Sequence, residues 1–308
     1  MADEKIAFVG IGIMGSGMLG NVLKAGYDVT AFDLNQEALD AAVDAGATEA
    51  ASSAEAAANA DLVHTVVPGP PELEAAVFGD NGIAAGIRPG SVFIQHATVD
   101  PETVISVADR LKQQGVDTID APLLRTPKHA ASGNLGFPVG AEPEVYARAK
   151  DVLATMSDTI YETGAVGTGS ALKLVNNMLN ITILCGAMEA ITLGTKSGLK
   201  LGTMIDAFYT TPARALHFEM MPWVFENRDF SPGFYTTLGH KDIRLAVKHA
   251  LNLRVPTSVS AAAYAMMAQA EASGLGRETY SSVLKLYEAA AEVTVELERD
   301  KLFEDDNV

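Results

Sequence analysis

The sequence is poor in cysteine and in aromatic residues. Cys185 is the only cysteine among 308 residues, and aromatic residues make up 6% of the chain. One cysteine excludes an internal disulfide and is typical of a reducing compartment, so we expect a cytoplasmic protein. Because Cys185 lies in an apolar helical stretch, we interpret it as a small core residue rather than a reactive thiol.

Positive charge is also scarce. Lys and Arg number 22 against 39 Asp and Glu, which gives a formal net charge of −17. Nucleic acids and anionic membranes are bound mainly through Lys and Arg, so we expect neither as a partner. A small anionic substrate is not excluded, because a few local cations outweigh a diffuse field that salt screens beyond ~10 Å.

Long hydrophobic runs are missing as well. We find no uninterrupted apolar run close to the ~20 residues that span a bilayer. The N-terminus passes from Lys5 directly into apolar residues 6–9, without a basic region or a cleavage site, so we expect no signal peptide. The histidines have no ligand-like spacing with acids or with cysteine, so we expect no metal site.

The first half of the chain alternates short apolar segments with helix-forming ones. Strands are predicted at residues 6–9, 27–32, 62–67, 91–96 and 118–119, and helices at 16–25 and 35–45, among others. Strands separated by helices at this spacing predict a parallel sheet that helices cover on both faces. The fold class is therefore α/β, with a Rossmann-type doubly wound parallel sheet over residues 1–165.

The second half shows almost no period-two alternation, so we predict an all-helical domain over residues 166–308. A long, mostly apolar helix at about residues 170–196 joins the two domains, and four prolines break the helices beyond it. The apolar character of this half suggests that subunits share helices. We therefore expect a homodimer or a homotetramer.

A glycine turn follows the first strand, with the sequence Gly10-Ile11-Gly12-Ile13-Met14-Gly15. The G-x-G-x-x-G pattern alone is weak evidence, but here a strand precedes it and an amphipathic helix follows it. Gly10 allows the tight turn, Gly12 lets a pyrophosphate approach the backbone, and Gly15 allows close packing of helix and strand. The helix N-terminus offers N–H groups to the phosphates. We predict that residues 10–15, including Ile13 and Met14, bind a dinucleotide.

Asp33 ends the second strand, where such folds place the acid that accepts the ribose hydroxyls. A carboxylate there repels a 2′-phosphate, which favours NAD over NADP. Capping of the helix that starts near Asn35 is the alternative role. Val67 ends the strand predicted at residues 62–67 and Pro68 follows it, at the carboxyl edge of the sheet where ligands bind, although a plain turn would look the same.

Four polar residues of the long helix lie at i, i+3, i+4 and i+7: Lys173, Asn176, Asn177 and Asn180. This spacing places them on one face, and their neighbours are apolar, so we expect a helix that is buried all round. Three asparagines on one stripe are costly in a helix unless something uses them. A hydrogen-bond network between the domains is one explanation. The other is an active-site wall, in which a desolvated Lys stabilises a developing oxyanion and donates a proton.

The pattern G-x-x-G-x-G-x-x-x-K-x-x-x-N from Gly164 to Asn177, together with the N-terminal GxGxMG, resembles the β-hydroxyacid dehydrogenase family over nearly the whole chain. The resemblance implies hydride transfer between a nicotinamide and a short 3-hydroxy acid or semialdehyde, with Lys173 as the catalytic residue and Asn177 orienting the reacting oxygen. It also implies that Thr98 lies near the nicotinamide and that Lys241 lies near the cofactor and the substrate.

The substrate loop departs from the D-A-P-V-S-G-G of common family members. Here Arg125 and Thr126 follow Asp120-Ala121-Pro122-Leu123-Leu124, and the guanidinium offers a planar fork of donors for an anion. This loop resembles the branch that contains 3-sulfolactaldehyde reductase, which implies that Arg125, Asn176 and Asn180 hold the anionic end. Carboxylates such as 3-hydroxyisobutyrate, 4-hydroxybutyrate or tartronate semialdehyde, a non-catalytic dinucleotide-binding module, and a plain surface ion pair for Arg125 remain alternatives.

Overall fold

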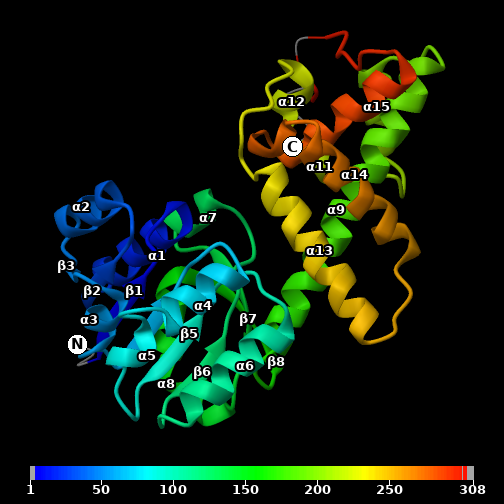
Figure 1. Ribbon diagram of the computed structural model, residues 1–308. Coiled ribbons are helices and arrows are strands. Elements are labelled where there is room, and N and C mark those ends of the chain that lie inside the picture. Colours follow the sequence, from blue (N-terminus) through cyan, green and yellow to red (C-terminus); the bar gives the residue numbers. More distant parts are fainter. Residues whose placement is uncertain (1–3, 300, 304–308) are drawn as a thin grey trace. The chain divides into compact units, whose positions relative to one another are not determined.

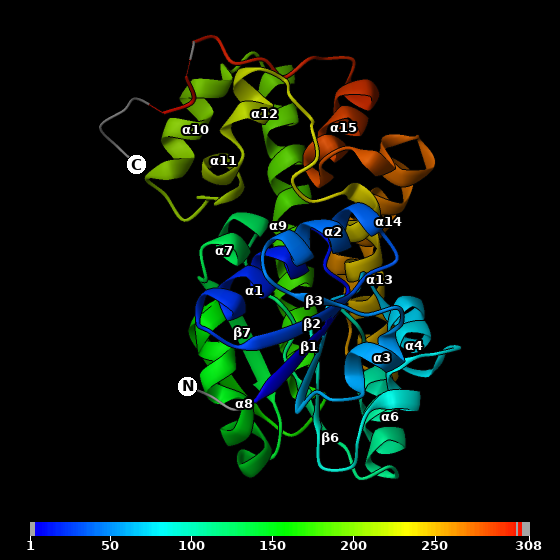
Figure 2. The same cartoon turned by 90° about the vertical axis from the view of Figure 1, so that its left-hand side faces the viewer.

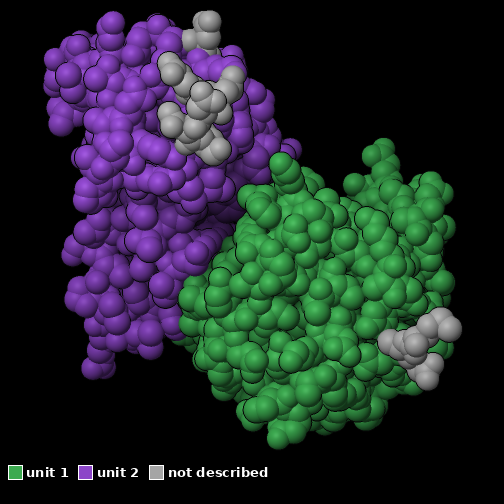
Figure 3. Space-filling model, turned by 180° about the vertical axis from the view of Figure 1, so that it is seen from behind, with its two compact units in different colours: residues 1–174 green, residues 175–308 purple. Residues whose placement is uncertain are grey.

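The structure is a computed structural model that describes residues 4–299 and 301–303. The chain forms two compact units, one up to Leu174 and one from Val175 onward (Figure 3). Helix α9 (Thr168–Lys196) contributes residues to both units.

One sheet organises the first unit. Within residues 4–174, eight strands form it in the order β3-β2-β1-β4-β5-β6-β7-β8. The strands are β1 Lys5–Val9, β2 Asp28–Phe32, β3 Thr48–Glu49, β4 Leu62–Thr65, β5 Val92–Gln95, β6 Asp117–Asp120, β7 Leu135–Gly140 and β8 Ser157–Gly164. β1 to β6 are parallel in the order typical of the Rossmann fold. The predicted α/β class and doubly wound sheet are confirmed.

Two features of the sheet differ from the expectation. It is not entirely parallel, because β7 pairs antiparallel with β6 through Asp120 and Gly140, and β8 then pairs parallel with β7. The short strand β3 and both β7 and β8 were also not predicted. β7 contains glycine and Pro138, which weaken a strand signal, and β8 is largely exposed and lacks an apolar run.

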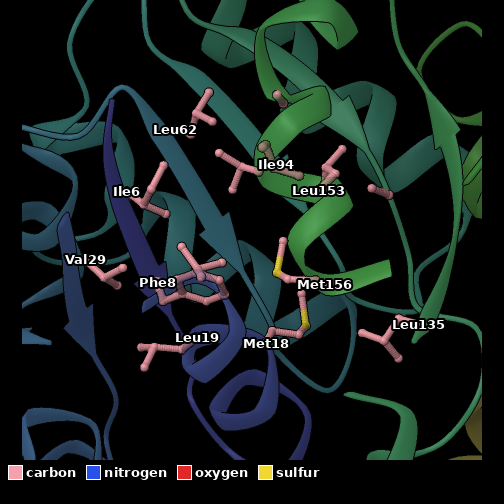
Figure 4. Packing of buried hydrophobic residues seen from close by; sticks show 14 of the residues in the cluster. Ile6, Phe8, Met18, Leu19, Val29, Leu62, Ile94, Leu135, Leu153 and Met156 are labelled. Atoms are coloured by element: carbon pink, nitrogen blue, oxygen red, sulfur yellow. The ribbon is translucent and has the colours of Figure 1, made fainter. Parts of the chain in front are cut away.

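Helices cover both faces of the sheet (Figures 1 and 2). On one face, α1, α2 and α8 pack on side chains such as Phe8 and Ile94, and Figure 4 shows this core from close by. On the other face, α3, α4, α5 and α6 pack on Val63 and Phe93. The helices of this unit before α9 are α1 Ile13–Lys24, α2 Gln36–Asp44, α3 Ser53–Ala57, α4 Pro70–Phe78, α5 Ile83–Gly86, α6 Pro101–Lys112, α7 Pro127–Ala131 and α8 Pro143–Met156.

The second unit is helical, as predicted. After α9 come α10 Leu201–Tyr209, α11 His217–Met220, α12 Pro222–Glu226, α13 Thr236–Asn252, α14 Ser258–Ala272, the 3₁₀ turns η1 Leu275–Arg277 and η2 Tyr280–Val283, and α15 Leu284–Ala291. Its core gathers one face of α9, including Ile181, Leu184 and Met188, with side chains of the later helices. Cys185 lies in this core, where burial and then the nearby Glu189 raise the pKa of its thiol to about 12.

Helix α9 is not buried all round, which corrects the sequence-based expectation. Apolar side chains on another face of the helix are exposed: Leu172 by 36%, Val175 by 54%, Leu179 by 58%, Ile183 by 41% and Leu193 by 69%. The helix is also long and apolar enough by composition to cross a membrane, with a mean hydropathy of 1.4 over its most apolar window. A helix of a protein core satisfies the same criterion, and α9 buries a face in the core of the second unit.

Candidate active site

The glycine turn is closely packed on its inner side and open at its centre. Gly10 has a φ of 88°, and a Cβ there would lie 2.4 Å from the Val66 carbonyl oxygen. A Cβ on Gly15 would lie 2.3 Å from the Gly10 carbonyl oxygen, whereas a Cβ on Gly12 would meet nothing within 4 Å. Gly12 is the N-cap of α1, so no side chain caps the first N–H groups of this helix. This geometry fits a pyrophosphate.

The side chains of Ile13 and Met14 differ in their surroundings. Ile13 is 70% exposed at the start of α1, whereas Met14 is half-buried and packs against the core beneath the turn. Met14 therefore supports the turn from below, while Ile13 lies on its outer surface.

Asp33 ties the end of β2 to the glycine turn. Its Oδ2 accepts a hydrogen bond of 2.6 Å from the Ile11 amide, and its Oδ1 accepts one of 2.8 Å from the Asn35 amide. Helix α2 is capped by Asn35, whose side chain accepts from the Glu37 amide, and not by Asp33. The half-buried carboxylate therefore lies beside the glycine turn.

The other predicted cofactor residues of this unit follow β4 and β5. Val67 borders the turn, since a Cβ on Gly10 would lie 3.3 Å from its Cγ1, and Pro68 is exposed just before α4. Thr98 is half-buried between β5 and α6. All three lie beyond the carboxyl ends of the parallel strands β4 and β5, and β4 borders the point between β1 and β4 where the strand order reverses.

Asp120 is a buried residue that sequence reasoning did not assign to the site. It ends β6, is 0% exposed, and holds the first turn of α9. Its Oδ2 accepts from the amides of Gly167 at 3.1 Å and Ser170 at 2.7 Å, while its Oδ1 accepts from Ser170 Oγ at 2.7 Å and Gln95 Nε2 at 2.8 Å. Burial raises the pKa of this carboxyl, and the hydrogen bonds oppose that effect. Lys173, half-buried, follows Ser170 within one helical turn.

In the second unit, the asparagines of α9 belong to a hydrogen-bonded chain with α13. Asn176 Nδ2 donates to Asn177 Oδ1 at 3.0 Å, and Asn177 Nδ2 donates to Asp242 Oδ2 at 2.6 Å. Lys241 Nζ lies 2.7 Å from Asp242 Oδ1. The structure thus brings together three of the predicted residues, Asn176, Asn177 and Lys241, and adds the buried Asp242. No sequence pattern showed that Asp242 contacts Asn177, because the two lie on different helices.

Asn180 contacts a residue that sequence reasoning left unassigned to the site. Its Oδ1 lies 2.8 Å from His217 Nε2, and His217 is only 4% exposed. Burial lowers the pKa of His217 to about 4, and a hydrogen bond with the backbone of Asn180 opposes this effect. The imidazole is therefore neutral at physiological pH.

Arg125 and Thr126 begin the segment that leads into α7. Arg125 has a φ of 77°, and its guanidinium donates to Asp158 Oδ1 at 2.6 Å, Thr159 Oγ1 at 3.1 Å and the Asn134 carbonyl. A hydrogen bond from Thr159 and then the contact with Arg125 hold the pKa of the exposed Asp158 below its usual value. Thr126 Oγ1 lies 2.7 Å from His129 Nδ1. In this conformation Arg125 forms the ion pair that was its alternative role.

The chain matches known families along most of its length. Residues 5–165 match the family described as the NAD binding domain of 6-phosphogluconate dehydrogenase, and residues 167–287 match that described as NAD-binding of NADP-dependent 3-hydroxyisobutyrate dehydrogenase. The chain is 34% identical to 2-(hydroxymethyl)glutarate dehydrogenase of Eubacterium barkeri, over 94% of this chain and 97% of that protein. It is 32% identical to 3-sulfolactaldehyde reductase of Escherichia coli K12, over 95% and 98% of the two chains.

A solved structure agrees with these matches. The structure of 3-hydroxyisobutyrate dehydrogenase of Mycobacterium tuberculosis with L-serine superposes with a TM-score of 0.82 at 29% identity, covering 92% of this chain and 98% of that one. With the glycine turn, Asp33 and the polar face of α9, these matches place the chain in the β-hydroxyacid dehydrogenase family, as an NAD-dependent oxidoreductase.

Proposed function

We propose that this enzyme transfers a hydride between NAD and a short anionic 3-hydroxy acid or semialdehyde of the 3-sulfolactaldehyde type. The observation that carries the proposal is the polar face of α9, where Lys173 follows a turn fixed by Asp120 and Asn177 is fixed by Asp242. Side chains that are held in this way present defined donors and acceptors to a reacting oxygen.

The cofactor lies against the first unit. The bound nicotinamide supplies the hydride in reduction and takes it in oxidation. The glycine turn would hold the pyrophosphate and Asp33 would accept hydrogen bonds from the ribose hydroxyls, which disfavours the 2′-phosphate of NADP. The proposed cofactor-binding residues are Gly10, Gly12, Ile13, Met14, Gly15, Asp33, Val67, Pro68, Thr98 and Lys241.

Lys173 donates and accepts the proton of the reacting oxygen. In reduction its ammonium donates a hydrogen bond to the carbonyl oxygen and then the proton, and in oxidation its neutral amine takes the hydroxyl proton back. Asn177 orients that oxygen with its second N–H, because its first N–H is held by Asp242. Asp242 therefore positions a substrate-binding residue.

The anionic end of the substrate is held by Arg125, Thr126, Asn176 and Asn180. A guanidinium suits a sulfonate or a carboxylate, and Arg125 adopts a backbone conformation usual for glycine at a position where common family members have glycine. A carboxylate substrate is the second candidate, because the two curated relatives described above are named for different substrates, a glutarate derivative and a sulfonate.

We further propose that two or four copies of the chain assemble through the exposed apolar face of α9, and that the enzyme acts in the cytoplasm, where its one buried thiol stays reduced. The first domain in this proposal comprises residues 1–165 and the second residues 166–308.

A substrate panel tests the function. Oxidation of 2,3-dihydroxypropane-1-sulfonate, 3-hydroxyisobutyrate, 4-hydroxybutyrate and L-serine is followed at 340 nm with NAD and with NADP. We expect the sulfonate to have the highest kcat/KM and NAD to exceed NADP by at least about tenfold, since a charge repulsion of 1.4 kcal/mol corresponds to that factor. Faster turnover of a carboxylate selects the second candidate. A preference for NADP contradicts the role of Asp33.

A further inference from the structure

Three side chains of the second unit meet at the polar face of α9. His217, the first residue of α11, lies against Asn180, and the rings of His217 and Tyr280 are 6.1 Å apart. His217 and Tyr280 are buried, at 4% and 6% exposure, while Asn180 is half-buried and has solvent access. His217 Nδ1 is buried and, among the residues that the structure describes, has no hydrogen-bond partner.

The contact determines which nitrogen of His217 carries the proton. Asn180 Oδ1 lies 2.8 Å from Nε2, and a carboxamide oxygen only accepts hydrogen bonds. The neutral imidazole has one N–H, so this N–H is on Nε2 and the buried Nδ1 keeps a lone pair. A fixed tautomer in turn fixes the carboxamide, whose oxygen points toward the imidazole.

Tyr280 lies beside the same pair of side chains. Burial raises the pKa of the Tyr280 phenol, and a hydrogen bond with Asn180 opposes that rise. Because the oxygen of Asn180 is held by His217, only the two N–H groups of its carboxamide remain to meet other partners. A ligand that reaches Asn180 therefore meets a donor.

We propose that His217 is a positioning residue that makes Asn180 an obligatory hydrogen-bond donor to the anionic end of the substrate. The inference rests on the proposed function and states that its substrate needs a hydrogen-bond donor at this position. With the oxygen held by His217, the carboxamide presents its N–H groups as donors to an incoming oxyanion. A free carboxamide would rotate and present either its acceptor oxygen or its donor N–H groups to the substrate.

Two substitutions at one position separate this role from a structural one. His217→Phe keeps the ring and its packing against Tyr280 but removes the donor. His217→Gln keeps a donor, because the amide nitrogen of Gln occupies nearly the place of Nε2. We expect His217→Phe to raise KM for 3-hydroxyisobutyrate or 2,3-dihydroxypropane-1-sulfonate about tenfold and to change kcat less than about threefold, and His217→Gln to restore most of the KM.

Two controls make the result specific. Methyl 3-hydroxyisobutyrate lacks the negative charge, so its kcat/KM is expected to change less than about twofold in His217→Phe. Thr182→Val removes a hydrogen bond of 3.1 Å between Thr182 of α9 and Ser260, away from the polar face. This variant shows the effect of general loosening of the helix, and we expect it to leave KM unchanged. Equal losses for charged and uncharged substrates, or a failure of Gln to restore KM, overturn the proposal.

A second measurement does not depend on activity. The ¹⁵N chemical shifts of the His217 ring distinguish the two neutral tautomers, and we expect the Nε2–H form in the wild type at pH 7. The Nδ1–H form would reverse the carboxamide and contradict the inference. If the wild type oxidises none of the hydroxy acids while the Nε2–H form is observed, the proposed function fails and the fixed carboxamide stands.

Discussion

Lys173 follows Ser170 within one helical turn, and the amide and hydroxyl of Ser170 are both held by Asp120. If Lys173 transfers the proton, Lys173→Ala lowers kcat by about 10²–10⁴-fold, the usual contribution of a general acid. Steady-state kinetics give kcat, and NADH fluorescence shows whether the variant still binds the cofactor. Lys196→Ala, at the exposed last residue of the same helix, is the matched control with normal turnover. Near-normal kcat in a folded Lys173→Ala protein would refute the assignment.

Arg125 and Asp158 give a second prediction at the residue scale. If Arg125 anchors the anion, Asp158 competes with the substrate for the guanidinium. Arg125→Ala is then expected to raise KM by about 10–100-fold, because a charge-assisted hydrogen bond is lost, whereas Asp158→Asn lowers KM by about two- to fivefold. Unchanged KM in both variants would leave Arg125 with the surface ion pair alone.

Sequence reasoning at this scale found residues that a local pattern marks, and it missed residues whose partners lie far along the chain. The glycine turn and the Lys–Asn stripe each occupy fewer than ten consecutive positions. Asp120 contacts a helix start 50 residues later, and Asp242 contacts Asn177 across 65 residues. Only the fold brings such pairs together. The roles of the predicted residues stay predictions until the variants are measured.

At the scale of elements, the start of α9 depends on the end of β6. Asp120→Ala removes the acceptor of two backbone N–H groups and of two side chains, so we expect the free energy of unfolding to fall by about 3–5 kcal/mol. Asp120→Asn is expected to cost about 1–2 kcal/mol, because one oxygen remains for the helix amides while Gln95 accepts the new N–H through its buried Oε1, which has no hydrogen-bond partner among the residues that the structure describes.

Urea unfolding followed by circular dichroism measures these losses. Asp117→Asn is the control on the same strand, since Asp117 pairs with a largely exposed Lys112, and we expect a change within about 0.5 kcal/mol. If Asp120→Ala unfolds at the urea concentration of the control, Asp120 does not hold the helix.

The elements predicted from sequence were those with a strong period. β1, β2, β4 and β5 each contain at least two adjacent apolar residues, so they were found, and β6 was predicted only at residues 118–119. β7 pairs with strands on both sides and β8 forms the edge of the sheet, and in both of them packing on neighbouring elements replaces an intrinsic strand preference. For α9, composition indicated complete burial, yet an apolar composition shows only that a face is to be covered and does not identify what covers it.

At the scale of the whole molecule, that exposed face is the strongest indication of assembly. Leu172, Val175, Leu179 and Ile183 follow each other at intervals of three or four residues, which is the spacing of a helix that packs along another helix. Monomeric proteins rarely expose a contiguous apolar stripe of this kind. We therefore expect the 32.3 kDa chain to elute as a dimer or a tetramer in size-exclusion chromatography with light scattering.

The paired substitution Ile183→Glu with Leu193→Glu places two charges on this face and is expected to give the monomer, because an unpaired charge is too costly to bury in an apolar interface. Neither residue belongs to the proposed site, so binding of NADH, measured by fluorescence, stays within about twofold of the wild type. Leu251→Glu alters an equally exposed leucine, 69% accessible, near the end of α13 and serves as the control. Dissociation by Leu251→Glu with an intact oligomer in the paired variant would move the interface from α9 to α13.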